Sequence, residues 1–139
     1  MDEQGALQAA LSYLGGGSLT FSGQAEGTIP VFSFSGKDAI GRNVEIAVSR
    51  QGGQVLWMMA EAAAGENGVP EEGTVSAMRD AAAKYLASHG YGAMEPTYAQ
   101  FYDGVGVFNF AAVQDNVILY SDLIKVYVER ATGHVVGVD

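Results

Sequence analysis

The sequence predicts an α+β protein made of two tandem units, each with one helix packed on a four-stranded antiparallel sheet. Three observations lead to this prediction. Apolar residues recur at helical spacing in two stretches and alternate with period two through most of the remaining chain. Clusters of glycine, asparagine and aspartate separate the alternating stretches, as expected at turns between strands. The second half of the chain also repeats the first, and an internal repeat predicts two copies of one structural unit.

The repeat is clearest in two stretches, Val44–Met58 and Ile124–Val138, which align without a gap at a separation of 80 residues. In both, alternating apolar residues flank a four-residue turn that ends in glycine, at Gly53 and at Gly133. Such a turn fits a type I turn followed by a left-handed residue and a G1 bulge. Glycine adopts that conformation without a steric penalty from Cβ. We therefore predict equivalent hairpins with a positive φ at both glycines.

A second pair of strings supports the same repeat. Val31–Phe34 matches Val107–Phe110 at a separation of 76 residues, and each string carries two phenylalanines in alternation. Alternating aromatic side chains need a face on which they can be buried. We expect these phenylalanines to mark the core face of each sheet.

The overall composition argues against several classes of protein. The 139 residues are 48% hydrophobic, carry a net charge of −9 and include no cysteine. An acidic domain repels phosphate groups, which argues against nucleic acid and against contact with an anionic membrane surface. Without cysteine there is no disulfide framework and no thiolate site. No apolar run reaches the ~18 residues that a membrane-spanning helix needs.

The first unit is predicted to begin with a helix that Asp2 and Glu3 start and that Gly15–Gly17 ends. Its apolar stripe comprises Leu7, Ala10, Leu11 and Leu14. Alternation then predicts two strands, a polar loop and the first hairpin, over the ranges Leu19–Ala25, Pro30–Phe34, Ser35–Asn43 and Val44–Met59.

Small, charged, glycine and proline residues over Ala60–Gly73 indicate a connection, so we divide the chain into units 1–66 and 67–139. Thr74 is expected to cap the second helix, which Gly90 ends. Its buried stripe comprises Val75, Met78, Ala82, Tyr85 and Leu86. Two strands follow over Met94–Tyr102 and Val105–Val113, and the stretch Val117–Val128 leads into the final hairpin, with turns at Asp103–Gly104 and Asp115–Asn116.

The sequence contains no recognisable catalytic or cofactor motif. His89 and His134, its two histidines, lack partners at the spacing of metal ligands. No nucleophile-elbow string occurs, and nothing distinguishes two of the many carboxylates as a glycosidase pair. We expect no enzymatic activity, metal or cofactor. An enzyme acting on peptidoglycan and a structural spacer remain the alternatives to a binding module.

The aromatic residues provide the candidate contact surface. Trp57 alternates with Val55 and Met59, and packing beneath the first helix is the expected role for it. The alternative is an interaction surface, since tryptophan and methionine are favoured at interfaces. Several tyrosines of the second unit fall on strands, where an open sheet face could bind a protein or a glycan. We predict four partner-binding residues: Trp57, Tyr102, Tyr120 and Tyr127.

A helix followed by four antiparallel strands resembles the PepSY domain. Four strings resemble the YpeB family of spore-germination proteins in particular: Ile29–Ser35 (IPVFSFS), Gly52–Met58 (GGQVLWM), Tyr120–Val128 (YSDLIKVYV) and Gly133–Asp139 (GHVVGVD). The resemblance covers nearly the whole chain and is weakest over residues 1–17 and 60–73.

This resemblance implies a non-enzymatic, extracytoplasmic protein at the outer face of the spore inner membrane. Members of the family act with the cortex-lytic hydrolase SleB, which they stabilise and restrain until germination. No catalytic residue or cofactor comes with the resemblance, and peptidoglycan is a second candidate ligand. The family typically begins with a membrane anchor that is absent here, and its last PepSY unit continues beyond a position such as Asp139. The resemblance therefore implies a portion of a longer protein.

Overall fold

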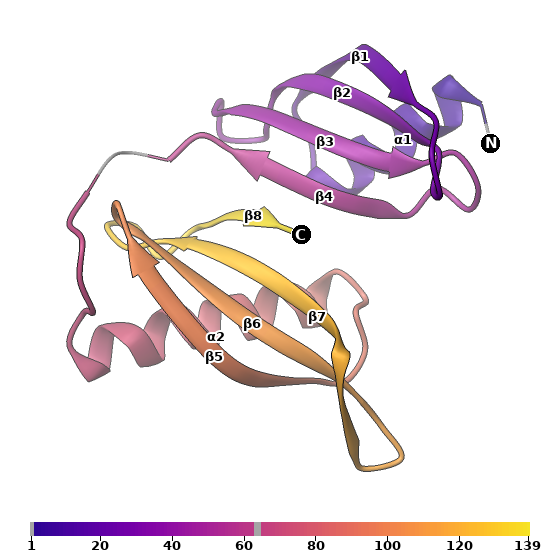
Figure 1. Cartoon of the computed structure of the whole chain (residues 1–139). Helices are drawn as coiled ribbons and strands as arrows, with labels where there is room; N and C mark the ends of the chain where they lie inside the picture. The colour runs from indigo at the N-terminus through magenta and orange to yellow at the C-terminus, as the bar shows by residue number, and fades with distance from the viewer. Residues whose placement is uncertain (1, 63–64) are drawn as a thin grey trace. The chain divides into compact units, whose positions relative to one another are not determined.

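A computed structural model describes residues 2–62 and 65–139 of the chain, with the side chains of residues 120–122 outside the description. The chain divides into two compact units, Met1–Glu61 and Ala62–Asp139. In the described part, each unit has one helix followed by four antiparallel strands, which confirms the predicted α+β class (Figure 1). Neither described helix is both long and apolar enough to cross a membrane.

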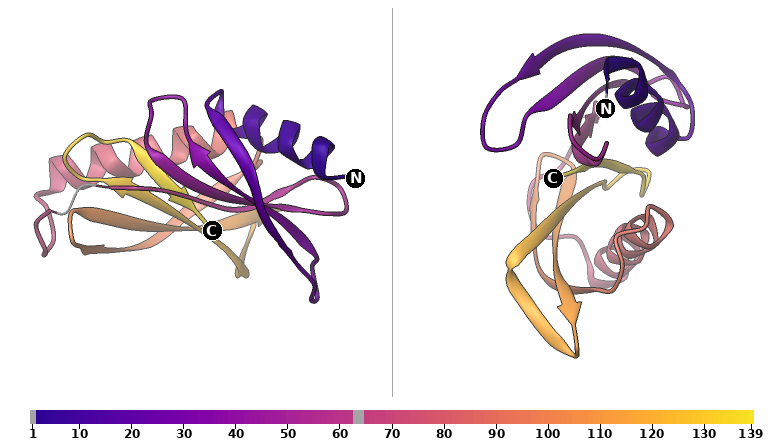
Figure 2. Two further views of the ribbon diagram at one scale, coloured as in Figure 1. Left: turned by 90° about the horizontal axis from the view of Figure 1, so that it is seen from above. Right: turned by 90° about the vertical axis from the view of Figure 1, so that its right-hand side faces the viewer.

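Unit 1 consists of α1 (Glu3–Leu14), β1 (Ser18–Ala25), β2 (Val31–Lys37), β3 (Asn43–Ser49) and β4 (Val55–Ala60). Its strands follow one another in the sheet in chain order, each antiparallel to the next. The helix lies against one face of this sheet, as the views in Figure 2 show. A meander of this kind needs only short connections.

Both ends of α1 are capped as the sequence predicts. The Asp2 carboxylate accepts a hydrogen bond of 2.8 Å from the Gly5 amide, which satisfies one of the free donors of the first turn. Gly15 adopts the left-handed conformation, with φ of 75°, and ends the helix. Ala6 and Ala10 are fully buried against the sheet.

Unit 2 consists of α2 (Glu72–Ser88), β5 (Met94–Tyr102), β6 (Val105–Gln114), β7 (Val117–Glu129) and β8 (Val135–Val138), again in a sequential antiparallel sheet. The expected start at Thr74 is wrong, because the helix begins at Glu72 with Glu71 at its N-cap and no side-chain cap. Pro70 lies just before the helix, and Glu72 complements the dipole of the first turn. The predicted stripe faces the core, with Met78 and Leu86 among its buried members.

The repeated hairpins are confirmed. Gly53 has φ of 64° and Gly133 has φ of 75°. The strand register shifts between Ala47 and Val48 in the first hairpin and between Tyr127 and Val128 in the second, again 80 residues apart. The repeat therefore extends to the irregularities of the strands.

A buried polar residue closes each of these turns. The hydroxyl of Ser49 accepts a hydrogen bond from the Gln54 amide and donates one to the Gln51 carbonyl. At the corresponding place, Thr132 donates to the carboxylate of Glu129. Ser49 and Glu129 each lie at the end of a central strand, where an unpaired backbone or side-chain polar group would destabilise the fold.

The phenylalanines are buried as predicted, but the alignment of their strands needs a correction. Phe34 pairs with Ile46 in unit 1, and Phe108 pairs with Val126, the counterpart of Ile46, in unit 2. The strands β2 and β6 thus correspond at a separation of 74 residues rather than 76. A slip of two residues keeps every side chain on its face, so alternation alone cannot detect it.

This slip changes which end of the strand carries a glycine. In unit 1 the sequence along the helix-covered face is Phe32, Phe34, Gly36, and in unit 2 it is Gly106, Phe108, Phe110. A Cβ at Gly36 would overlap the Ser18 backbone of β1, whereas a Cβ at Gly106 would meet the Met78 side chain of α2. Each glycine therefore lies where another element approaches its strand so closely that a Cβ would overlap it.

The predicted loop Ser35–Asn43 is shorter than expected, because β2 continues to Lys37 and β3 begins at Asn43. The connection between them is held by Asp38, whose carboxylate accepts hydrogen bonds from the amides of Ile40 and Arg42 and from the Arg42 guanidinium. Burial alone would raise the pKa of Asp38, but these donors lower it below its ordinary value.

In unit 2 the same connection is a longer hairpin. The pair Ala111–Leu123 corresponds to the last pair of β2 and β3, and the ribbon continues through three more pairs to the turn at Asp115–Asn116. Both turn residues have positive φ, as a type I′ hairpin turn requires. The ribbon is visible as the long orange hairpin in Figure 1.

Candidate interaction surfaces

Each sheet has one face covered by its helix and one face without a helix, which we call the open face. In unit 1, Phe34, Ile46 and Met58 pair with one another across three strands and are almost fully buried. They form the helix-covered face. Because successive residues of a strand point to opposite faces, their neighbours in sequence belong to the open face.

Trp57 lies on the open face of unit 1. It is the neighbour of Met58 and the cross-strand partner of Ala47, and it is half-buried. The expectation that it packs beneath the first helix is therefore wrong. Alternation within β4 correctly groups Trp57 with Met59, but the register shift places Val55 opposite Val48, on the other face. The face that Trp57 occupies is decided by the pairing of Ile46 with Met58, which a single strand does not reveal.

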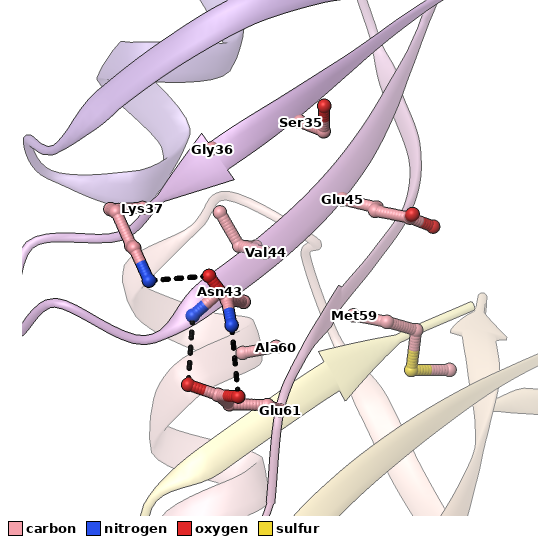
Figure 3. A pocket seen from close by; sticks show the side chains of 9 residues that line it. All are labelled: Ser35, Gly36, Lys37, Asn43, Val44, Glu45, Met59, Ala60 and Glu61. Carbon is pink, nitrogen blue, oxygen red and sulfur yellow. Dashed lines mark hydrogen bonds between the residues drawn. The ribbon is translucent and has the colours of Figure 1, made fainter.

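A shallow groove of about 560 Å³ lies on the open face of this unit (Figure 3). Two cross-strand rows of the open face line it: Ser35, Glu45 and Met59 form one, and Lys37, Asn43 and Glu61 form the other. The remaining lining residues are Gly36, Val44 and Ala60. The groove therefore lies where β2 ends, β3 begins and β4 ends.

A network of hydrogen bonds fixes one end of the groove. Lys37 Nζ donates to Asn43 Oδ1, and Asn43 Nδ2 donates to Glu61 Oε2 at 3.1 Å. The Asn43 amide donates to the other oxygen of Glu61, also at 3.1 Å. These bonds from Asn43, with a smaller contribution from the charge of Lys37, lower the pKa of Glu61. Glu61 thus remains a carboxylate well below neutral pH.

None of the predicted partner-binding residues lines the groove. Asn43 and Glu45 alternate with apolar residues along β3, which places both polar side chains on one face. Lys37, like Asn43, belongs to the predicted loop Ser35–Asn43, and Glu61 belongs to the predicted connection. Only the register joins them to Asn43.

The open face of unit 2 carries two of the predicted tyrosines. Tyr127 pairs with Val107 and Tyr102 pairs with Val105, whereas Phe108 belongs to the helix-covered face. Tyr102 is 51% exposed and Tyr127 is half-buried. Burial raises the pKa of Tyr127, and the charges of Asp139 and Tyr102 raise it further. The two tyrosines thus lie on the same face, on the two strands that flank β6.

The remaining two predicted residues are not part of this pair. Tyr120 lies in β7, but its side chain is outside the part of the chain that the structure describes. The register on β7 shifts beside it, since Leu119 pairs with Ala112 and Leu123 pairs with Ala111. Trp57 belongs to unit 1.

A buried asparagine shapes the edge of the open face in unit 2. Asn109 is 1% exposed, and its side chain donates to the Tyr98 carbonyl at 3.3 Å. The Thr97 hydroxyl donates to the Asn109 carbonyl. Thr97 and Tyr98 form a bulge in β5, where the register shifts between Pro96 and Ala99. The signal for it in the sequence was a proline inside a predicted strand, which is found at edges and bulges.

The histidines have local roles. His89 stacks on Tyr85 at 4.0 Å and its Nδ1 lies 2.8 Å from the Tyr85 carbonyl, at the end of α2. The His134 amide donates to Thr132 within the second repeated turn. Among the described side chains of residues 2–62, 65–119 and 123–139, no three histidine, aspartate or glutamate residues gather closely enough to hold a metal ion.

Comparison with known proteins identifies the family. The family model described as YpeB sporulation, PepSY1 and PepSY2 domains matches residues 1–139. The chain belongs to the YpeB family. The two units described above are consistent with the two PepSY domains named in that description.

Two relatives place this region of YpeB within longer proteins. The sporulation protein YpeB of Halalkalibacterium halodurans is 30% identical over 90 residues, which cover 65% of this chain and 19% of the relative. The solved structure of the Bacillus megaterium YpeB C-terminal domain superposes with a TM-score of 0.78 at 23% identity, over all of this chain and 62% of that one. The second comparison supports the fold. This chain thus spans a minor part of the curated relative.

Proposed function

We propose that this YpeB region is a non-enzymatic binding module that contacts a SleB-type cortex-lytic hydrolase, stabilises it and restrains it until germination. The module works outside the cytoplasm, at the outer face of the spore inner membrane, where the cortex is accessible. Membership of the YpeB family supports the assignment to sporulation. The observation that carries the binding role is the pair Tyr102 and Tyr127 on the open face of unit 2.

This tyrosine pair has the properties of an interface anchor. Tyrosine supplies a large apolar ring with a polar tip, and few torsions are immobilised when it is buried by a partner. Tyr102 still has half of its surface accessible, while Tyr127 is already partly fixed by its neighbours. A partner that covers both rings would bury apolar area and meet little opposing entropy. Tyr120 and Trp57 remain candidate contacts on the same reasoning.

The direct test measures binding to the purified hydrolase from the same organism. We expect saturable binding by the parent protein and at least about tenfold weaker binding by the double variant Tyr102→Ala/Tyr127→Ala, since two interface aromatics together contribute more than ~1.4 kcal/mol. Tyr91→Ala, a tyrosine outside the open face, serves as the matched control. Circular dichroism must show that all variants are folded.

The outcomes separate the alternatives. A chain that binds no hydrolase acts as a structural spacer, and the proposal fails. Equal binding by the parent and the double variant leaves the hydrolase as partner but removes the tyrosine pair as the contact. Sustained release of reducing sugars from isolated cortex by this protein alone would indicate an enzyme that acts on peptidoglycan.

A further inference from the structure

We propose that the open face of unit 1 binds an arginine side chain of a protein partner, held by Glu45 and Met59, which line the groove, and by Trp57, the next residue of β4 on the same face. The proposal rests on the role of this region as a binding module, and it adds a second contact site with a defined chemistry. This site is formed within unit 1 alone.

The shape of the site follows from the register. Glu45 and Met59 are direct cross-strand partners, and Trp57 is the next residue along β4 on the same face. Directly opposed side chains have Cβ atoms about 5 Å apart, and diagonal ones about 7–8 Å apart, within reach of long side chains. An arginine stem can therefore lie on Met59 while its guanidinium reaches the carboxylate of Glu45.

Charge distinguishes Glu45 from the other charged residues of the groove. Lys37 and Glu61 lie at the same end of the groove and are both hydrogen-bonded to Asn43. The positive charge of Lys37 is therefore already offset by the nearby carboxylate of Glu61. Glu45 is exposed, and no ion pair with it occurs among the described residues. Its charge is therefore available to a cation from outside the protein.

The remaining observations favour arginine over other ligands. The chain carries 16 acidic and 7 basic residues, so a partner with basic side chains is drawn toward it. A guanidinium can stack on an indole and bind a carboxylate through two parallel hydrogen bonds, whereas an ammonium group offers neither planar contact. Trp57 on β4 supplies the indole, and Glu45 on the adjacent strand β3 supplies the carboxylate.

The test uses a capped pentapeptide, Gly-Gly-Arg-Gly-Gly, titrated into the isotopically labelled protein and followed by two-dimensional NMR of the amides. Trp57 is the sole tryptophan, so its indole N–H gives one unambiguous signal. We expect saturable shifts of this signal and of the Glu45 and Met59 amides, which weaken as salt is added. The same peptide with citrulline, the neutral isostere of arginine, should leave these signals unchanged.

Two glutamate variants complete the design. Glu45→Gln should weaken binding of the arginine peptide by about fivefold, corresponding to the ~1 kcal/mol of an exposed ion pair. Glu95→Gln, which neutralises a glutamate of β5 in the other unit, should bind like the parent. The same spectra report whether each variant is folded.

Equal shifts with citrulline, or equal affinity of the Glu45→Gln and Glu95→Gln variants, would overturn the arginine site. The hydrolase is absent from this experiment. A negative result here would therefore not contradict the tyrosine contact. A negative result in the hydrolase-binding test would likewise not contradict the arginine site.

Discussion

Substitution of the turn glycines tests the repeat on which the fold is built. Gly133 has φ of 75°, and a Cβ built on it meets no atom within 4 Å. Crowding by neighbours is therefore absent, and the penalty of a larger residue comes from its own backbone. A left-handed residue with a Cβ costs about 1–2 kcal/mol, and a β-branched one belongs at the upper end. Gly133→Val should lower the free energy of unfolding by this amount.

Thermal and urea denaturation followed by circular dichroism measure this loss. A loss of 1 kcal/mol lowers Tm by about 4–8 °C in a domain of 60–100 residues, the size class of unit 2. Gly53→Val should cause a comparable loss in unit 1, which the fluorescence of Trp57 reports. Gly133→Asn is the matched control, because asparagine tolerates the left-handed region and should lose less than valine. A Gly133→Val variant within about 0.5 kcal/mol of the parent would refute the reasoning.

Two further predictions concern Asp38 and the glycines of β2 and β6. Asp38→Ala should cost about 1–3 kcal/mol at pH 7, because three donors lose a charged acceptor. The lowered pKa of Asp38 means that its contribution is present above about pH 4 and is lost as pH falls through the folded-state value. Urea denaturation followed by Trp57 fluorescence should therefore show parent and variant converging as the pH falls below the folded-state pKa of Asp38; a constant difference would contradict this. Gly36→Ala should cost about 1–3 kcal/mol and expose β1 amides to hydrogen exchange, since its Cβ would overlap the Ser18 backbone. Gly106→Ala should cost less, because the Met78 side chain can move; equal losses would contradict the geometry.

Local patterns were enough to predict most elements of the fold. The hairpin of Val44–Met58, the cap at Asp2 and the turn at Asp103–Gly104 depend on neighbouring residues, so the sequence contains their causes. The strand from Met94 to Tyr102 was predicted with its correct bounds for the same reason. Its bulge was not predicted, because it depends on Asn109 of the next strand.

Features that depend on pairing between strands could not be read from one strand. Alternation grouped Trp57 with Met59 but could not decide which face of the sheet they occupy. The same limit applies to the two-residue slip between β2 and β6, since Phe34 and Phe108 stay on the same face in either alignment. The groove beside Glu45 is a further example, because three strands contribute to it.

The central claim is that this YpeB region restrains a cortex hydrolase without acting on cortex itself. The most direct measurement follows the release of reducing sugars from isolated spore cortex with the protein alone, with the SleB-type hydrolase alone, and with both. We predict release at the buffer level for the protein alone and a lower rate for the mixture than for the hydrolase alone, an inhibition that Tyr102→Ala/Tyr127→Ala reverses. Release by the protein alone, or an unchanged hydrolase rate at saturating protein, would contradict it.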